Sequence, residues 1–305
     1  MIGIKEIGTF VPAKRISNYH RMTTLNTNEA FISSKLGMEE LARNEGMSVA
    51  EMCCNAFENL TESISVNVGD IDCIVLCTQN GDSTIPHTSA VIQHKLGAKD
   101  TCAVFDLSLG CSGYVYGLSV VKSLMESCGL KNGLFFTCDP YSSILDSTDR
   151  NTELLFGDAA TVTLLQSSPE FYIGHTTFLT KGEFADALKI NDQGHLAMNG
   201  RKVFEFAARN VPGNIEACIE KNKSSFDKID AFLFHQGSKF IVDTLIKKFE
   251  LPKEKVPFGC SSYGNTVSSS IPLLLKNNVS DSDKTLLLSG FGVGLGAAST
   301  MLMRY

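Results

Sequence analysis

The sequence lacks the long apolar runs typical of membrane-spanning proteins and the excess of basic residues typical of nucleic-acid-binding proteins. No apolar stretch approaches the roughly 20 residues of a membrane-spanning helix, and Lys5 and Glu6 interrupt the N-terminal segment that would have to form a signal peptide. The formal net charge of −6 argues against nucleic-acid binding, for which a broad basic face is expected. We therefore expect a cytoplasmic protein that binds neither membranes nor nucleic acids.

Metal and disulfide motifs are also missing. The ten cysteines form no paired C-x-x-C motif with histidine partners, and no H-E-x-x-H spacing occurs among the six histidines. A chain of 305 residues, 43% of them hydrophobic, buries a core without disulfides, and a reducing compartment keeps thiols free. We expect no metal site and mostly buried thiols. The histidines expected at the surface are His20, His87, His94, His175 and His195.

What the chain does contain is an alternation of strand and helix patterns from end to end. The segments that read as buried strands are 71–77, 101–107, 133–138, 160–165, 229–235 and 284–290. Ser48 and Glu51 have capping-box spacing before a helical apolar pattern, and the apolar stripe within 242–249 indicates another helix. This alternation predicts an α/β fold with largely parallel strands.

Two pairs of segments suggest an internal duplication. "IDCIVL" at 71–76 is similar to "IDAFLF" at 229–234, and Phe-Gly pairs at 156–157 and 291–292 each precede a late strand. Chance similarity between apolar strands is the alternative, because such strands use few residue types. If the duplication is real, the polar "QSSPE" separates an N-terminal half, 1–166, from a C-terminal half, 167–305.

Cys111 lies in the sequence "DLSLGCSGYVYGL", between a predicted strand and a helix predicted from Ser112 to about Ser127. Backbone N–H groups at a helix N-terminus favour a thiolate over a thiol and can also face an oxyanion. Glycines on both sides leave room for a substrate. A nucleophile and an ordinary buried cysteine both fit this pattern.

Three other features could serve such a nucleophile. His235 ends the apolar run "AFLF", and Asn265 lies in the small-residue turn "SSYGNTVSSSIP". A hydrogen-bonded strand-end histidine and a turn-forming asparagine are the structural alternatives. The glycines of "SGFGVGLGAAS" never satisfy G-x-G-x-x-G, which excludes a nicotinamide site. They fit either an oxyanion-binding backbone or close packing of two strands.

Several motifs together resemble one known family. "IGTFVPAKRISN", "DLSLGCSGYVYGLS", "STDRNTELLFGDAA", "FHQGSKFI", "YGNTVSSSIP" and "GFGVGLGAA" occur in the order typical of the β-ketoacyl-acyl-carrier-protein synthase III branch of the thiolase superfamily. The resemblance runs through nearly the whole chain. It implies a thiolase-like, duplicated five-layer α-β-α-β-α fold, a homodimer, and no cofactor other than coenzyme A carried as a substrate thioester.

The resemblance also implies catalytic roles. Cys111 would accept an acyl group from an acyl-coenzyme A or an acyl-carrier protein, while His235 and Asn265 would polarise a malonyl-carrier-protein thioester as it loses carbon dioxide. Two neutral hydrogen-bond donors stabilise the enolate formed in that step. Backbone N–H groups of Cys111 and Val293 would hold the oxyanion of the condensation, in fatty-acid initiation or in a specialised acyl pathway.

Binding roles follow from the same resemblance. The residues implied to contact coenzyme A are Phe31, Lys35, Arg150, Phe204 and Ser238. Phe31 and Lys35 stand where the family often has tryptophan and arginine, whereas Arg150 matches the family.

Two surfaces are implied as well. Lys239, Lys247 and Lys248 would dock an acidic carrier protein, although Phe240 replaces an arginine linked to that docking. Ile85 would enter the acyl pocket of the dimer mate in place of a phenylalanine. A smaller residue there favours a longer or branched acyl chain.

Other functions fit the sequence less well. A papain-like hydrolase places its cysteine in a C-G-[SA]-C-[WY] setting, and a serine esterase needs G-x-S-x-G; neither motif occurs. An acyltransferase of the same fold that works without decarboxylation would not need Asn265. A non-catalytic partner subunit would be expected to have lost one of Cys111, His235 and Asn265, and all three are present.

Overall fold

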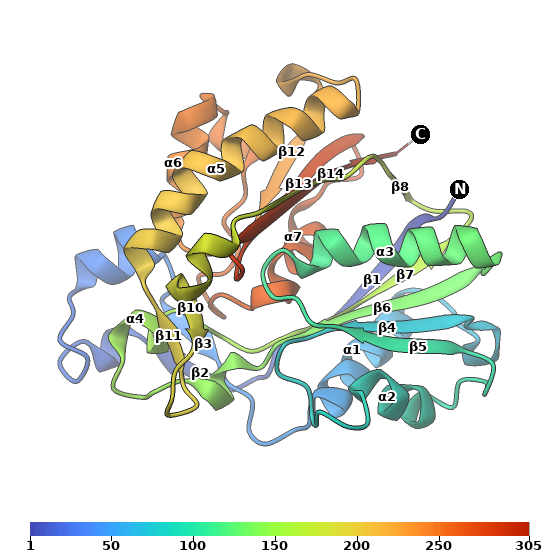
Figure 1. The fold of residues 1–305 in the computed structure, drawn as a ribbon, viewed down its shortest axis with the longest axis horizontal. Helices are drawn as coiled ribbons and strands as arrows, with labels where there is room; N and C mark the ends of the chain where they lie inside the picture. The colour runs from blue at the N-terminus through green and yellow to red at the C-terminus, as the bar shows by residue number, and fades with distance from the viewer. Residues whose placement is uncertain (305) are drawn as a thin grey trace.

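Helices and strands form layers in the computed structural model, which describes residues 1–304 (Figure 1). The strands of the main sheet are β1 (Gly3–Phe10), β4 (Cys73–Cys77), β5 (Ala103–Leu107), β6 (Asn132–Cys138), β7 (Ala160–Gln166), β8 (Phe171–Ile173), β9 (Thr177–Thr180), β12 (Ala231–Phe234), β13 (Thr285–Gly292) and β14 (Gly296–Met303). Two small antiparallel pairs are β2 (Arg15–Ser17) with β3 (Glu40–Ala42), and β10 (Leu188–Ile190) with β11 (Leu196–Met198). The helices are α1 (Val49–Ser63), α2 (Thr88–Leu96), α3 (Gly113–Cys128), α4 (Arg150–Glu153), α5 (Gly200–Lys221), α6 (Lys239–Phe249) and α7 (Ser270–Asn278).

The two halves of the main sheet repeat one arrangement of strands. In the first half β4 runs parallel to β6, which pairs antiparallel with β7. In the second half β12 runs parallel to β13, which pairs antiparallel with β14. The similar segments 71–76 and 229–234 fall at β4 and β12. The expected boundary after residue 166 lies between β7 and β8, and a division into two domains there stays a prediction.

Five layers of helix and sheet are visible in Figure 1. Helices α3 and α7 lie between the strands of the two halves, α1 and α2 cover the outer face of the first half, and α5 and α6 cover that of the second. Three apolar clusters are buried between these layers. This arrangement matches the predicted five-layer fold, and burial of these clusters supplies most of the force that holds it together.

All six predicted strands are present, and α1 begins with the predicted capping box of Ser48 and Glu51. The expectation of largely parallel strands was wrong. Only the pairs β4–β5, β4–β6 and β12–β13 are parallel, and the other pairs of the main sheet are antiparallel. The reason is connection length, since three residues join β13 to β14 whereas a parallel crossover needs about a dozen or more.

The expectation of mostly buried thiols agrees with the structure, and so does the expected surface position of four of the five histidines. All ten cysteines are free thiols, and eight of them are buried. His195 is half-buried, and the other histidines predicted at the surface are exposed. Within residues 1–304 no group of histidine, cysteine and acidic residues could hold a metal ion. None of the helices described is long and apolar enough to span a bilayer.

Candidate active site

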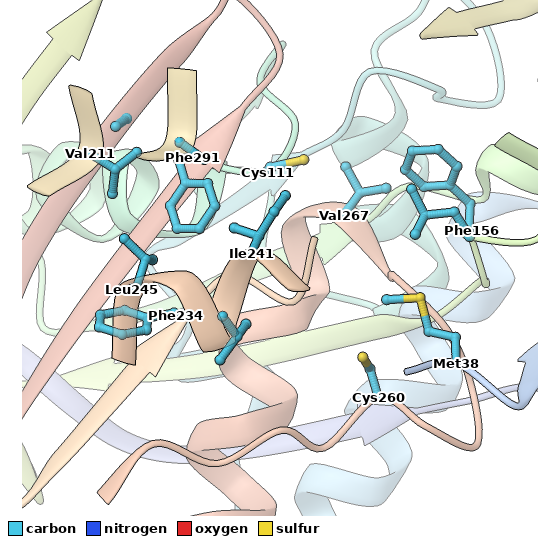
Figure 2. Packing of buried hydrophobic residues seen from close by; sticks show 14 of the residues in the cluster. Met38, Cys111, Phe156, Val211, Phe234, Ile241, Leu245, Cys260, Val267 and Phe291 are labelled. Carbon is cyan, nitrogen blue, oxygen red and sulfur yellow. The ribbon is translucent and has the colours of Figure 1, made fainter. Parts of the chain in front are cut away.

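Cys111 lies in the turn that connects β5 to α3, as the sequence predicted. Its side chain is only 4% exposed, and it forms part of the lining of a cavity of about 450 Å³. Figure 2 shows its sulfur among buried apolar side chains that include Ile241, Val267 and Phe291. The cysteine is therefore buried, but it borders a cavity and is not enclosed by packed side chains on every side.

His235 and Asn265 line the same cavity as Cys111. His235 directly follows β12, and Asn265 lies in the loop before α7. Both residues are buried, with exposures of 2% and 3%. The fold thus brings together three residues that are far apart in the sequence. We call Cys111, His235, Asn265 and the neighbouring Gly292 the floor of the cavity.

His235 is held as a neutral ring. Burial lowers its pKa to about 3, because the charged form loses its hydration. Its Nδ1 lies 2.7 Å from the Ser270 hydroxyl, and Phe291 packs edge-on against the ring. When the Ser270 hydroxyl donates to Nδ1, the ring proton is on Nε2. His235 then offers a neutral N–H donor to a ligand in the cavity.

Asn265 is fixed by both its backbone and its side chain. Its N–H donates to the carbonyl of Leu155, its carbonyl accepts from the N–H of Gly157, and its Oδ1 accepts from the N–H of Val267 at 2.9 Å. With Oδ1 occupied, the Nδ2 amide is left for a ligand. Asn265 can therefore act as a second neutral donor beside His235.

The glycine-rich strand β13 passes directly over the Cys111 turn. A Cβ at Gly292 would lie 2.7 Å from the Cys111 sulfur, and one at Gly290 would lie 2.7 Å from the Cys111 carbonyl oxygen. No side chain fits at either position. This close approach brings the N–H of Val293 near the Cys111 sulfur, where it and the cysteine's own N–H lower the pKa of the thiol. The alternating glycines therefore serve close strand packing and also aim an N–H at the nucleophile.

One sequence-based expectation about Cys111 was wrong. The helix N-terminus was expected to favour a thiolate, but burial and the carboxylate of Asp139 raise the pKa of the Cys111 thiol to about 12. The N–H groups of Val293 and Cys111 lower that pKa by less. Removal from water outweighs nearby backbone dipoles here, so the resting side chain is a thiol.

The opening of the cavity contains most of the residues expected to contact coenzyme A. Phe31, Lys35, Phe204 and Ser238 all line the cavity, as does Phe240. Arg150 does not line it, and its guanidinium donates to the carbonyl of Asn26. The structure thus brings together four of the five expected residues, with Arg150 beside Asn151, which does line the cavity.

An aromatic stack spans this opening. The ammonium group of Lys35 lies 3.7 Å from the centre of the Phe240 ring, and the Phe204 ring stacks on Phe240 with 4.9 Å between centroids. Phe240 is 39% exposed, so the stack faces solvent. We call Phe31, Lys35, Phe204 and Phe240 the mouth of the cavity. It joins the short helical segment Phe31–Leu36 to α5 and α6.

The other predicted surface residues lie outside the cavity. Ile85 is 88% exposed in the loop before α2, where it is free to contact another molecule. Lys247 and Lys248 are exposed in the last turn of α6. Lys239, in the first turn, forms an ion pair with Asp243. A docking role is open to all three lysines, but Lys239 already has an acidic partner.

Sequence reasoning missed several residues around the floor. Ser270 bonds His235, and Asp139 contacts the loops behind Cys111. The position of Asp139 was a readable signal, because it directly follows a buried strand, at the edge where α/β sheets place functional groups. Ser270 carried no such signal, since the serines at 268–270 are indistinguishable in the sequence.

Comparison with known proteins was consistent with this geometry. The family model described as 3-oxoacyl-[acyl-carrier-protein (ACP)] synthase III matches residues 105–182, and its C-terminal counterpart matches residues 219–304. The β-ketoacyl-[acyl-carrier-protein] synthase III of Streptococcus sanguinis is 32% identical over 311 residues, which cover 96% of each chain. The corresponding protein of Lactococcus lactis is 31% identical, with the same coverage.

Solved structures agree with the sequence relatives. The 3-oxoacyl-[acyl-carrier-protein] synthase III of Aquifex aeolicus superposes with a TM-score of 0.93 at 27% identity and covers 100% of both chains. The priming β-ketosynthase of the R1128 polyketide pathway superposes with a TM-score of 0.91 at 26% identity, covering 100% of this chain and 96% of its own. The chain therefore belongs to the 3-oxoacyl-[acyl-carrier-protein] synthase III family, the acyltransferase-type condensing enzymes of fatty-acid biosynthesis with the thiolase-like fold.

Proposed function

We propose that Cys111 is acylated by an acyl-coenzyme A, or by an acyl-carrier protein, and that the acyl group then condenses with malonyl-carrier protein. The observation that carries the proposal is the convergence of Cys111, His235 and Asn265 on one cavity. A buried cysteine without catalytic function has no need of two neutral donors and a close backbone N–H. Family membership supports the same assignment.

In the first step the Cys111 sulfur attacks the carbonyl carbon of the donor thioester. The new sulfur–carbon bond replaces the donor's own, and the thiol proton ends on the departing thiol. The N–H groups of Cys111 and Val293, which both act on the thiol, would stabilise the oxyanion that forms on the carbonyl oxygen, two bonds from the sulfur. The acyl-enzyme stores the acyl group as a thioester, which is uncharged and so suits the buried site.

In the second step the malonyl carboxylate leaves as carbon dioxide and its electron pair forms an enolate. Nε2 of His235 and Nδ2 of Asn265 donate to the enolate oxygen, and neither donor carries a competing charge. The enolate carbon attacks the acyl carbonyl, and collapse of the tetrahedral intermediate expels the Cys111 sulfur. One proton taken from solvent restores the thiol.

We propose that substrates enter through the mouth, with Phe31, Lys35, Phe204 and Ser238 contacting the donor's pantetheine or nucleotide part. Among the described residues 1–304, the cavity lining contains the basic residues Lys35 and Arg201 and no acidic residue, which suits a phosphate-bearing thioester. Arg150 lies close enough in the chain to contribute from outside the cavity.

We propose further that the protein acts as a homodimer in the cytoplasm. Ile85 would reach the partner's acyl pocket, as the family resemblance implies, and its 88% exposure leaves it accessible to a second protomer. The exposed Lys247 and Lys248, with Lys239, would dock the acidic carrier protein. No separate cofactor is needed, because coenzyme A enters as part of a substrate.

The direct test is product analysis. Purified protein is incubated with a panel of acyl-coenzyme A donors and malonyl-carrier protein, and mass spectrometry follows 3-oxoacyl-carrier protein while trapped gas reports carbon dioxide. Both products are expected in equal amounts. Acyl transfer without carbon dioxide would contradict the condensation and favour an acyltransferase that does not decarboxylate. Absence of any turnover would favour a non-catalytic partner subunit.

A further inference from the structure

A buried carboxylate lies behind the floor of the cavity, outside the cavity lining. Asp139 follows β6 and has no solvent exposure. Its Oδ1 accepts a hydrogen bond from the N–H of Gln79 at 2.7 Å, and its Oδ2 accepts one from the hydroxyl of Ser268. One side chain thus joins the loop after β4 to the loop before α7.

The side chain of Gln79 lies next to the turn that carries the nucleophile Cys111. Oε1 of Gln79 accepts from the hydroxyl of Tyr141 at 2.9 Å. A Cβ placed on Gly110, the residue before Cys111, would lie 2.6 Å from that Oε1 and 3.3 Å from the Tyr141 hydroxyl oxygen. The Cys111 turn therefore rests directly on the pair of side chains that Asp139 helps to place.

Ser268 lies in the same loop as Asn265, the residue proposed to bind the enolate. Ser268 directly follows Val267, whose N–H holds the Asn265 side chain. The Val267 side chain also reaches the Cys111 turn, since its Cγ1 would lie 3.4 Å from a Cβ on Gly110. Asp139 is thus bonded directly to the Asn265 loop, and it supports the Cys111 turn indirectly through Gln79.

We propose that Asp139 is a positioning residue that holds the Cys111 turn and the Asn265 loop in the relation needed for condensation. The proposal rests on the function proposed above for Cys111 and Asn265. A misplacement of about 1 Å between reacting groups can reduce a rate about a hundred-fold, so a rigid link between the two loops has a direct catalytic use. Burial and saturation with donors make Asp139 such a link.

The charge of Asp139 provides an independent signal of this contact. It raises the pKa of Cys111, and the other titratable groups that face it are Cys77 on β4, Cys138 on β6 and Tyr141. Burial raises the pKa of Asp139 itself to about 6, so the carboxylate is charged at pH 8. Removal of that charge should make the Cys111 thiolate easier to form.

The test compares Asp139→Asn, which removes the charge, with Ser268→Ala, which removes one hydrogen bond and keeps the charge. We expect both to lower kcat of condensation about ten-fold or more, with KM of the acyl donor changed less than about two-fold. At pH 8, iodoacetamide labelling of the Cys111 peptide should become about three-fold to ten-fold faster in Asp139→Asn and stay within about two-fold in Ser268→Ala. The exposed Asp192→Asn serves as the control and should change neither readout.

Wild-type kcat in both variants, or unchanged Cys111 labelling in a folded Asp139→Asn variant, would overturn the proposal. If Asp139→Asn does not fold, Ser268→Ala alone tests the proposal. A lowered kcat with unchanged Cys111 labelling would support the positioning role of Asp139, and a wild-type kcat would contradict it. The labelling arm needs no acyl substrate. A failure of the proposed function, seen as no acylation of the wild-type protein, is therefore distinguishable from a failure of the bridge.

Discussion

The floor and the mouth of the cavity differ in how their residues are held. On the floor, Cys111, His235 and Asn265 are all less than 5% exposed and are fixed by backbone contacts or buried hydrogen bonds. At the mouth, the side chains of Lys35 and Phe240 contact each other at the solvent-exposed surface. A substitution on the floor must displace backbone or leave a buried group unpaired, whereas one at the mouth changes a solvated surface.

The same division appears in the family motifs. By the resemblance described above, the floor would keep the family's cysteine, histidine and asparagine, while at the mouth phenylalanine and lysine would stand where tryptophan and arginine are common. We infer that the floor sets the reaction and the mouth sets the choice of donor. Variants in the two regions should therefore separate the chemical step from substrate binding.

The largest effect should come from Asn265→Ala on the floor. Removal of one enolate donor is expected to lower the rate of condensation by about 10² to 10³-fold, since that is the usual value of an oxyanion donor. Acylation of Cys111 should continue, because we propose that backbone N–H groups, and not Asn265, hold the acylation oxyanion. Separate assays of acyl-enzyme formation and condensation check this, with the exposed Asn67→Ala as control. Equal loss of both steps would show that Asn265 is structural.

A second floor variant tests the close approach of β13. In Gly292→Ala the new Cβ would lie 2.7 Å from the Cys111 sulfur, so either the strand or the cysteine must shift. We expect acylation to slow by about ten-fold to a hundred-fold. Gly182→Ala is the matched control, because nothing lies within 4 Å of its added Cβ. Rapid-quench measurement of acylation that matches wild type would contradict the role assigned to the Val293 N–H.

The smallest effect is expected at the mouth. Phe240→Ala removes the ring between Lys35 and Phe204, and such aromatic contacts are worth about 1 kcal/mol each, so KM of the acyl donor should change about three-fold to ten-fold. The kcat value should stay within about two-fold. Steady-state kinetics check this, with the exposed Ile190→Ala as control. A large loss of kcat would break the division between floor and mouth.

The sequence predicted the fold and the floor well because both depend on local patterns. Buried strands give continuous apolar runs, and the floor residues lie at strand ends and turns, where Cys111 and His235 stand out among apolar neighbours. Strand direction was not readable in the same way, because it depends on where the chain turns back after β6 and β13.

The charge state and the depth of burial of Cys111 could not be predicted from the sequence either. The thiolate expected for Cys111 was wrong because the pattern around it shows a helix start but not the depth of burial or the nearby Asp139. The Lys35–Phe240 contact joins segments more than 200 residues apart, so no local spacing could have indicated it. Such long-range side-chain contacts appear only once the layers have packed.

The central claim is that the buried thiol of Cys111 carries the acyl group, and intact-mass analysis tests it most directly. Wild-type protein incubated with acyl-coenzyme A and acyl-carrier-protein donors should gain the mass of one acyl group, and Cys128→Ala, which removes the exposed cysteine, should gain the same mass. Cys111→Ala should gain none. An adduct that persists in Cys111→Ala, or the absence of any adduct in the wild-type protein, would contradict the account.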